Sequence, residues 1–221
     1  MKKELIVTAD GSHSVGFVGE HITYHSTHGA IQESMHVFIE AGLLQLPAKN
    51  QFSIFEMGFG TGLNALLTIA QAEKNQQKIY YETVETDPLE PGMYRLLNYC
   101  QQLNRPDLQP LFELLHSCDW NTIIEITPYF SFKKQLTSLH EFSPGRHFDL
   151  IYFDAFAPEV QPDLWTAAVF KKLYECMEPG ALLTTYCSKS IVRKAMTEAD
   201  LHVTKIPGPP HKREMVRATK R

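Results

Sequence analysis

Three closely spaced glycines, in Gly58-Phe59-Gly60-Thr61-Gly62, are the strongest chemical signal in this sequence. Glycine allows a backbone to turn tightly and to approach a ligand closely, and a helix that begins there offers free N–H groups. The pattern Gly-x-Gly-x-Gly differs from the Gly-x-Gly-x-x-Gly of dinucleotide-binding proteins, and no Lys-Ser or Lys-Thr follows it as in a P-loop. It predicts a nucleotide-type ligand; a plain tight turn is the competing interpretation.

Two acidic positions follow that could serve the same ligand. Glu85 comes 23 residues after Gly62, where a carboxylate can accept hydrogen bonds from both hydroxyls of a ribose. Asp87 competes for that role, although its place just before a proline also fits a helix cap. Asp119, followed by Trp120, can bind an adenine amino group while the indole covers the ring, if the pair ends the third strand. A helix cap beside a core tryptophan is the alternative.

A further carboxylate, Asp154, stands in Phe153-Asp154-Ala155-Phe156-Ala157-Pro158, directly after an apolar run. In open α/β sheets, ligands bind outside the carboxyl ends of the strands, where the strand order reverses. A carboxylate placed there, between a sulfonium and an incoming amine, can orient the amine and take its proton. We therefore predict that Asp154 is catalytic; an Asp that only caps the following turn is the alternative.

The elements that must position these residues alternate between strand and helix patterns. Apolar runs predict strands at 52–57, 79–84, 147–153 and 181–186. Helices are predicted at 63–73, 88–100, 162–177 and 188–199, the last with Ser188 as its N-cap. This alternation predicts a parallel sheet with helices on both faces. Short strands at 202–206 and 214–219 predict a closing antiparallel hairpin.

The sequence thus predicts an α/β, Rossmann-like three-layer sandwich with a mostly parallel seven-stranded sheet and a C-terminal antiparallel hairpin. Residues 121–136 are expected to form a hairpin inserted before the fourth main strand. Residues 1–50 are expected to be an N-terminal extension, with a hairpin around Asp10-Gly11-Ser12 and a helix from Ala30 to Leu44. Residues 51–221 are expected to form the catalytic domain.

Composition limits the classes of function. Of the 221 residues, 43% are hydrophobic and 21% charged, as in globular proteins, and no apolar run reaches the roughly 18 residues of a membrane span. The apolar run near the N-terminus is too short for a secretory signal. The four cysteines lie far apart, and His25 and His28 lack neighbouring ligands, so we expect no disulfide framework and no metal site. A cytoplasmic protein with no membrane association is the simplest interpretation.

The charge is unevenly distributed. The formal net charge is −4, but residues 189–221 carry +6, so the first 188 residues carry −10. The basic segment is either an ordinary solvated face or a patch that holds a phosphate backbone. Its candidates for contacting RNA are Lys189, Arg193, Lys212 and Arg213.

The order of these motifs resembles that of class I methyltransferases, which use S-adenosylmethionine. The strings resemble, in particular, the methyltransferase domain of the MnmC family of tRNA-modifying proteins and its stand-alone form, MnmD. The resemblance spans nearly the whole chain. It rests on Thr8–His13, Tyr24–Ser26, Glu56–Asn64, Asp154–Pro158, Pro162–Trp165, Thr185–Ser188, Val192–Lys194 and Lys212–Met215.

The resemblance implies methylation, from S-adenosylmethionine, of the amine of 5-aminomethyl(-2-thio)uridine at the tRNA wobble position, giving the 5-methylaminomethyl nucleoside. Asp154 is expected to be catalytic, Tyr24 and Phe156 to pack against the flipped uracil, and the basic residues to contact the anticodon stem-loop. The residues expected to bind the cofactor are Glu56, Gly58, Phe59, Gly60, Thr61, Gly62, Asn64, Glu85, Asp119, Trp120, Asp154 and Ala155.

In the bifunctional members of this family, an FAD-dependent domain first exposes the amine. Because this sequence ends at Arg221, we expect no FAD oxidase activity, no stable protein partner, and a separate enzyme that installs the aminomethyl group. Three alternatives remain open. The acidic balance of the first 188 residues favours a small-molecule or protein N-methyltransferase. The glycine spacing argues against a dinucleotide-dependent oxidoreductase, and Asp154 argues against a non-catalytic binding module.

Overall fold

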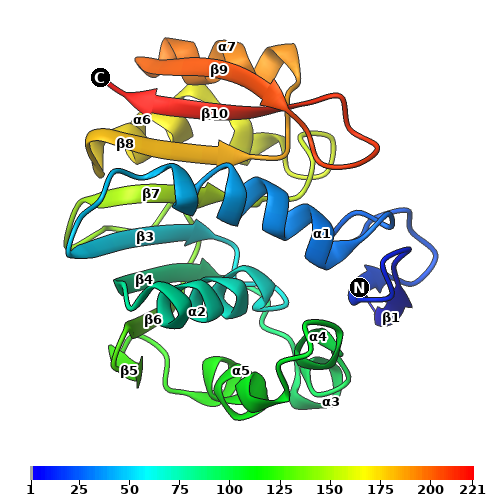
Figure 1. The fold of residues 1–221 in the computed structure, drawn as a ribbon. Coiled ribbons are helices and arrows are strands. Elements are labelled where there is room, and N and C mark those ends of the chain that lie inside the picture. The colour runs from blue at the N-terminus through cyan, green and yellow to red at the C-terminus, as the bar shows by residue number, and fades with distance from the viewer. Residues whose placement is uncertain (1) are drawn as a thin grey trace.

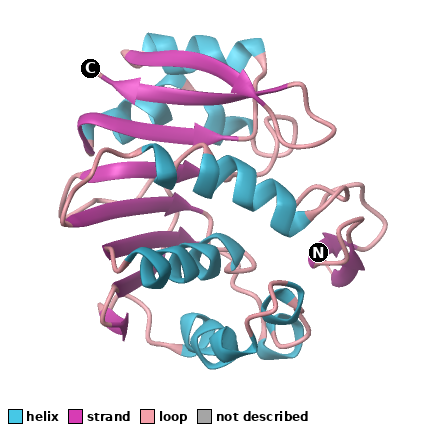
Figure 2. Ribbon diagram, in the orientation of Figure 1, coloured by secondary structure: helices cyan, strands magenta, loops and turns pink. Residues whose placement is uncertain are grey.

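The computed structural model describes residues 2–221 and places a sheet between two layers of helices (Figures 1 and 2). The eight strands follow the order β5-β6-β4-β3-β7-β8-β10-β9. Five of them are parallel: β3 (Gln51–Met57), β4 (Lys78–Glu85), β6 (Phe130–Leu136), β7 (Phe148–Phe153) and β8 (Met177–Thr185). The predicted α/β architecture is confirmed, and the eighth strand is the short edge strand β5 (Ile124–Thr127), antiparallel to β6.

The antiparallel end of the sheet is the predicted C-terminal hairpin of β9 (Leu201–Pro207) and β10 (Glu214–Lys220). β10 also pairs antiparallel with β8, with Val216 opposite Thr185. The loop from Pro207 to Glu214 therefore lies at the edge of the sheet where β8 and the other parallel strands end (Figure 1).

Helices cover both faces of the sheet. One face carries α1 (Ala30–Ser34), its π-helical continuation η1 (Met35–Glu40), η2 (Leu43–Gln45), α2 (Leu63–Asn75) and α5 (Gln109–Ser117), and the other carries α6 (Ala167–Glu175) and α7 (Ser190–Glu198). Neighbouring residues of β3 point to opposite faces: Ile54 packs in one apolar cluster and Phe55 in the other. This double burial explains why the strand has a continuous apolar sequence. Within residues 2–221, no helix is long and apolar enough to span a membrane.

The N-terminal hairpin holds α1 in place. Its strands are β1 (Lys3–Val7) and β2 (His13–Phe17), as the sequence predicts. The turn between them supplies side-chain acceptors to the first turn of α1: Asp10 Oδ2 accepts from the N–H of Gln32 at 3.0 Å, and Ser12 Oγ from that of Ala30 at 3.2 Å. Unpaired N–H groups at a helix start are satisfied in this way.

Three local predictions are wrong. The helix expected at 88–100 starts only at Pro91, because a proline disfavours helical backbone at the residue before it and Glu90 is extended. A further break at residues 95–98 divides it into α3 (Pro91–Tyr94) and α4 (Tyr99–Gln102). The helix expected at 162–177 is split into η4 (Pro162–Trp165) and α6, since Thr166 caps α6 by accepting from the N–H of Val169. Lys189, not Ser188, is the N-cap of α7.

The prediction that a third strand ends at Cys118-Asp119-Trp120 is also wrong. The residues before it form η3 (Pro106–Leu108) and then α5, which buries Phe112 and Leu115 against the sheet. A spacing of three residues between buried side chains suits a helix. The third parallel strand is instead β6, the second strand of the predicted hairpin within 121–136.

Candidate active site

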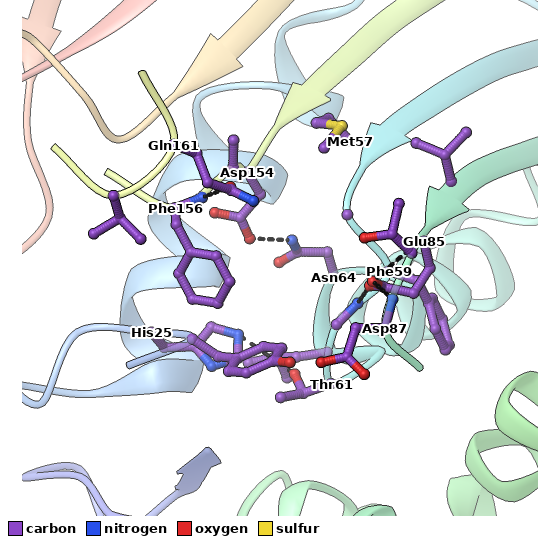
Figure 3. A pocket seen from close by; sticks show the side chains of 18 of the residues that line it. His25, Met57, Phe59, Thr61, Asn64, Glu85, Asp87, Asp154, Phe156 and Gln161 are labelled. Atoms are coloured by element: carbon purple, nitrogen blue, oxygen red, sulfur yellow. Dashed lines mark hydrogen bonds between the residues drawn. The ribbon is translucent and has the colours of Figure 1, made fainter. Parts of the chain in front are cut away.

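A cavity of about 370 Å³ lies at the carboxyl ends of β3, β4 and β7 (Figure 3). β3 pairs with β4 on one side and β7 on the other, so the strand order reverses there, as at ligand sites of open α/β sheets. Met57 is opposite Phe153, which brings Gly58 and Asp154 out of the sheet side by side. Among the residues that line the cavity are Phe17, Tyr24, His25, Gly58, Phe59, Gly60, Thr61, Asn64, Glu85, Asp87, Thr137, Asp154, Ala155 and Phe156.

The loop between β3 and α2 forms one wall. At Gly60 and Gly62 the backbone has positive φ values of 51° and 74°, which L side chains rarely adopt. A Cβ on Gly60 would lie 3.1 Å from the Tyr24 ring, and one on Gly62 would lie 3.0 Å from both the Phe59 ring and Nε2 of His116. Glycine is therefore required here both by conformation and by space. Gly60 lines the cavity as predicted, whereas Gly62, also predicted to bind the cofactor, does not line it and packs against Phe59 and His116 instead.

Glu85, at the end of β4, fixes that loop. Its Oε2 accepts from the N–H of Gly60 at 2.8 Å, and its Oε1 accepts from those of Thr86 and Asp87 at 2.7 and 2.8 Å. The competing acid, Asp87, forms an ion pair with Lys3 at 2.9 Å. Within the described part of the chain, no lysine, arginine or protonated histidine pairs with Glu85. This difference favours Glu85 over Asp87 for the ribose.

Asp154 faces the cavity from the end of β7. Nδ2 of Asn64, in the first turn of α2, donates to its Oδ2 at 2.9 Å (Figure 3). Burial raises the pKa of Asp154 to about 7, against the opposing effect of the Asn64 hydrogen bond. A carboxyl group with this pKa can both take and release a proton near neutral pH.

Glu56 lies behind this pair rather than in the cavity wall, with only 1% of its surface exposed. Its Oε2 and the Oδ1 of Asn64 have no hydrogen-bond partner among residues 2–221. Burial raises the pKa of Glu56 well above its usual range, and the nearby Asp154 adds to that effect. A neutral Glu56 avoids a second buried negative charge next to Asp154.

Three aromatic rings form a second wall, which adjoins the glycine-rich loop at Tyr24. Tyr24 and Phe156 meet edge to face at 5.1 Å between ring centroids, and Phe17, in β2, lies 6.0 Å from Tyr24 and 5.9 Å from Phe156. The Phe156 ring stands beside the Asp154 carboxyl group in Figure 3. The structure therefore brings Tyr24 to Asp154 and Phe156, from which the sequence separates it by about 130 residues, and adds Phe17, for which the sequence gives no signal.

Two histidines at the site were assigned no role from the sequence. His25 lines the cavity, and its Nδ1 hydrogen-bonds Ser14 Oγ at 2.9 Å. His116 stacks on Tyr94 at 4.2 Å, and its Nε2 hydrogen-bonds the Thr61 carbonyl oxygen at 3.1 Å. Burial lowers the pKa of His25 to about 4 and that of His116 to about 3, so both are neutral at physiological pH. The segment Tyr24-His25-Ser26, part of the family resemblance, could have indicated that His25 lies at the site. No sequence motif indicates His116.

Asp119 and Trp120 do not line the cavity. Asp119 is exposed in the turn after α5, and Trp120 packs with its ring 4.5 Å from Nζ of Lys134. Lys134 in turn donates to the carbonyl of His116 near the end of α5. Trp120 thus contributes to the packing between α5 and β6, whereas Asp119 is exposed. The position after the third parallel strand belongs to Thr137, which does line the cavity.

The four basic candidates lie near the same edge of the sheet but differ in their contacts. Lys189 forms an ion pair with Glu159, and Lys212 forms one with the buried Glu33 of α1. Arg193 donates to the Ser188 carbonyl at 3.2 Å. Arg213 is exposed, and its side chain has no hydrogen bond or ion pair with the residues that the structure describes. The four basic residues are thus not equally available to an RNA.

A parallel sheet closed by an antiparallel hairpin, with a glycine-rich loop after β3, an acid after β4 and a carboxylate after β7, defines a class I methyltransferase fold. The predicted fold class is confirmed. Residues 129–221 match a family described as S-adenosyl-L-methionine-dependent methyltransferase. The predicted cofactor, S-adenosylmethionine, is therefore confirmed.

Relatives and solved structures agree. The chain is 31% identical over 208 residues to the "tRNA 5-methylaminomethyl-2-thiouridine biosynthesis bifunctional protein MnmC" of Ralstonia nicotianae, covering 87% of this chain and 31% of that protein. The protein of the same description from Chromobacterium violaceum is 28% identical over 227 residues, covering 95% of this chain and 33% of its own length. The crystal structure of MNMC2 from Aquifex aeolicus has a TM-score of 0.80 at 22% identity, over 100% of this chain and 70% of that one.

The resemblance to the methyltransferase domain of MnmC is thereby confirmed. The chain spans 31% of the length of the Ralstonia relative. The structural similarity at 22% identity concerns the fold. The similarity of fold does not assign the activities of those longer proteins to this chain.

Proposed function

We propose that this protein is a tRNA methyltransferase that moves a methyl group from S-adenosylmethionine to the amine of 5-aminomethyl(-2-thio)uridine at the wobble position. The observation that carries the proposal is the Asp154 carboxyl group at the end of β7, held by Asn64 between the glycine-rich loop and the aromatic wall. The names of the relatives, which concern 5-methylaminomethyl-2-thiouridine in tRNA, favour this acceptor.

The glycine-rich wall suits an adenosyl ligand, because Gly58 and Gly60 line the cavity with bare backbone that a ligand can approach closely. Gly58, Phe59, Gly60 and Thr61 would hold the methionine part. Glu85 would accept from one ribose hydroxyl through the remaining lone pair of Oε2, since its other acceptor sites are used by three backbone N–H groups. Thr137 would stand on the adenine side in place of Asp119. When bound, S-adenosylmethionine supplies the methyl group and leaves as a neutral thioether.

The acceptor amine is mostly protonated at neutral pH and must lose a proton to become a nucleophile. Asp154 can accept that proton, because burial raises the pKa of its carboxyl group to about 7. The Asn64 amide holds the carboxyl group in one orientation at 2.9 Å. Alignment of the two reactants in the cavity would supply most of the remaining acceleration.

The anticodon stem-loop would approach over the edge that carries Lys189, Arg193, Lys212 and Arg213, with the wobble base stacked against Tyr24 and Phe156.

The test is transfer of labelled methyl groups from S-adenosylmethionine to total tRNA from cells that lack this protein, followed by nucleoside analysis. We expect label in 5-methylaminomethyl uridines only. Unmodified tRNA transcripts, which lack the aminomethyl group, serve as the control and should remain unlabelled. Label in another nucleoside would overturn the proposed acceptor. No transfer to tRNA, with cofactor binding intact, would overturn the proposed function and redirect it to a small-molecule or protein amine.

A further inference from the structure

His116, near the end of α5, does not line the cavity and is packed among aromatic side chains next to the glycine-rich loop. Its ring stacks on that of Tyr94, with 4.2 Å between ring centroids and 7° between ring planes, and meets Phe112 edge to face at 5.0 Å. Phe59, in the loop itself, lies 4.9 Å away. These contacts fix the orientation of the ring, so its two nitrogens point in fixed directions.

One polar contact joins this ring to the loop. Nε2 of His116 lies 3.1 Å from the carbonyl oxygen of Thr61. Because a carbonyl oxygen can only accept, Nε2 carries the hydrogen and donates it. Burial lowers the pKa of His116 to about 3, so the ring is neutral at physiological pH and has no second N–H. Without this donor, the carbonyl group of the buried Thr61 would lose its hydrogen bond from the ring.

The loop that receives this hydrogen bond depends on contacts from outside. All three of its glycines have positive φ values, from 51° to 85°. A segment so rich in glycine has many other backbone shapes open to it. Glu85, from β4, accepts from the N–H of Gly60 at 2.8 Å, and His116, from α5, donates to the carbonyl group of the next residue, Thr61. Two elements thus hold consecutive residues of the loop.

The support continues behind His116, at a residue that the sequence assigned to the adenine. Nζ of Lys134, in β6, donates to the carbonyl oxygen of His116 and lies 4.5 Å from the centroid of the Trp120 ring. Lys134 is buried, with 1% of its surface exposed. Its donor satisfies a carbonyl group in the last turn of α5, where the helix supplies no N–H. Trp120 therefore supports His116 through Lys134 without reaching the cavity.

We propose that His116 is a positioning residue for the cofactor, which holds the glycine-rich loop in its ligand-binding shape through the hydrogen bond from Nε2 to the Thr61 carbonyl group. It acts through the loop and not by contact with the ligand. A loop that is already shaped binds its ligand more tightly, because less ordering remains to be done on binding. This inference rests on the proposed function for the role of the loop in holding S-adenosylmethionine, but the shape of the loop can be measured without any substrate.

The test compares His116→Gln with His116→Met. Both substitutions replace the ring by an unbranched side chain of similar length and lose the stacking on Tyr94 equally, but only glutamine has an N–H donor. Titration calorimetry with S-adenosylhomocysteine should give a dissociation constant about three- to tenfold higher for His116→Met than for His116→Gln, the value of one hydrogen bond. In methyl transfer, the KM for S-adenosylmethionine should differ by the same factor and kcat should be equal.

His36→Met is the matched control. Nε2 of His36 also lies near a backbone carbonyl oxygen, that of Pro207 at 3.0 Å, and His36 does not line the cavity. This substitution should therefore leave the dissociation constant for S-adenosylhomocysteine unchanged. Urea unfolding of each variant establishes that it is folded.

Two measurements without cofactor report on the loop directly. Hydrogen exchange at the backbone amides of residues 59–62 should be faster in His116→Met than in His116→Gln, with no difference in β7 and β8. In the parent protein, nitrogen–proton NMR correlations of the imidazole groups should show His116 as the neutral Nε2–H tautomer. This second measurement needs no variant, so it tests the hydrogen bond even if His116→Met does not fold.

Equal affinity of the two His116 variants for S-adenosylhomocysteine would overturn the proposal, as would an Nδ1–H tautomer in the parent protein. An equally large loss in His36→Met would assign the effect to general stability and would also overturn it. These outcomes are distinct from failure of the proposed function. If the parent protein binds S-adenosylhomocysteine but does not methylate tRNA, the proposed acceptor is wrong and the role of His116 stands. If the parent protein does not bind S-adenosylhomocysteine, both are wrong.

Discussion

The two walls of the cavity are built in different ways. The wall that we propose holds the cofactor comes from Gly58–Thr61 and Glu85, at the ends of two adjacent parallel strands, and its contacts are mostly with backbone groups. The acceptor wall brings together Phe17 and Tyr24 from the N-terminal segment with Asp154 and Phe156 from the end of β7, and its contacts are between side chains.

This difference separates cofactor binding, which is common to the fold class, from acceptor binding, which is specific to each enzyme. Backbone N–H donors and glycines form a cofactor site that class I methyltransferases with different acceptors can share, because they all use the same cofactor. The side-chain wall can change with the acceptor without disturbing the sheet. Substitutions in the cofactor wall should therefore impair S-adenosylmethionine binding, and those in the acceptor wall should impair catalysis or acceptor binding with the cofactor still bound.

The largest expected effect is on catalysis through Asp154. Asp154→Asn keeps the size of the side chain but removes the proton acceptor, so kcat for methyl transfer to tRNA should fall by about 10²–10⁴-fold. The dissociation constant for S-adenosylmethionine should change by less than about threefold. Single-turnover transfer of labelled methyl and calorimetry measure the two quantities. A comparable loss in both would place Asp154 in the cofactor wall and remove the distinction.

The same substitution should stabilise the protein at high pH. The pKa of Asp154 rises from 3.8 to about 7 on folding, so the folded state holds the proton more tightly than the unfolded state. The free energy of unfolding therefore falls as pH rises from about 4 to about 7, by at most about 4 kcal/mol at about 1.36 kcal/mol per pKa unit. The amide introduced by Asp154→Asn cannot ionise, so the variant should gain stability relative to the parent between these pH values.

Urea unfolding of both proteins at pH 5 and pH 8 provides the measurement. His25 and His116, whose pKa values are lowered by burial, change stability in the opposite direction, but they are present in both proteins and cancel in the comparison. The parent and the variant should be closest in stability at pH 5 and differ most at pH 8. A variant that is less stable than the parent at pH 8 contradicts the burial of an ionised Asp154.

Behind the proposed cofactor wall, Gly62→Ala should have the next effect, through the loop that it shapes rather than through contact with the ligand. An L residue at φ 74° costs about 1–2 kcal/mol, and its Cβ would lie 3.0 Å from Phe59 and His116. The loop must shift, so we expect S-adenosylmethionine to bind about tenfold or more weakly, with kcat at saturating cofactor nearly unchanged. Gly92→Ala is the matched control, because nothing lies within 4 Å of its added Cβ. Equal effects of the two substitutions would refute the role of Gly62.

The contrast between the walls also explains what the sequence could predict. The buried strands, the glycine-rich loop and the acid after β4 are local signals, because parallel strands and tight turns impose residue types on consecutive positions. Phe17 and His116 reach the site through packing of distant segments, which leaves no local pattern. Asp119 and Trp120 fit the motif order, but a helix precedes them and the third parallel strand comes later, at β6.

The smallest expected effect distinguishes two adjacent basic residues, Lys212 and Arg213. Arg213 is exposed, so Arg213→Ala should weaken tRNA binding about two- to fivefold and lower the salt slope of log K by about 1, with no change in the pH profile. Lys212→Met leaves the buried Glu33 without its ion pair, and the Glu33 charge acts to raise the pKa of Asp154. The pH profile of kcat/KM should then move to higher pH.

Filter binding at several salt concentrations and kcat/KM between pH 6 and 9 separate these effects. The double variant Glu33→Gln with Lys212→Met removes both charges of the pair and should return the pH profile towards that of the parent. A salt slope that falls equally for Lys212→Met and Arg213→Ala, with unshifted pH profiles, would assign both residues to the RNA. In that case Lys212 does not influence the pKa of Asp154, and its ion pair with Glu33 only joins α1 to the loop from Pro207 to Glu214.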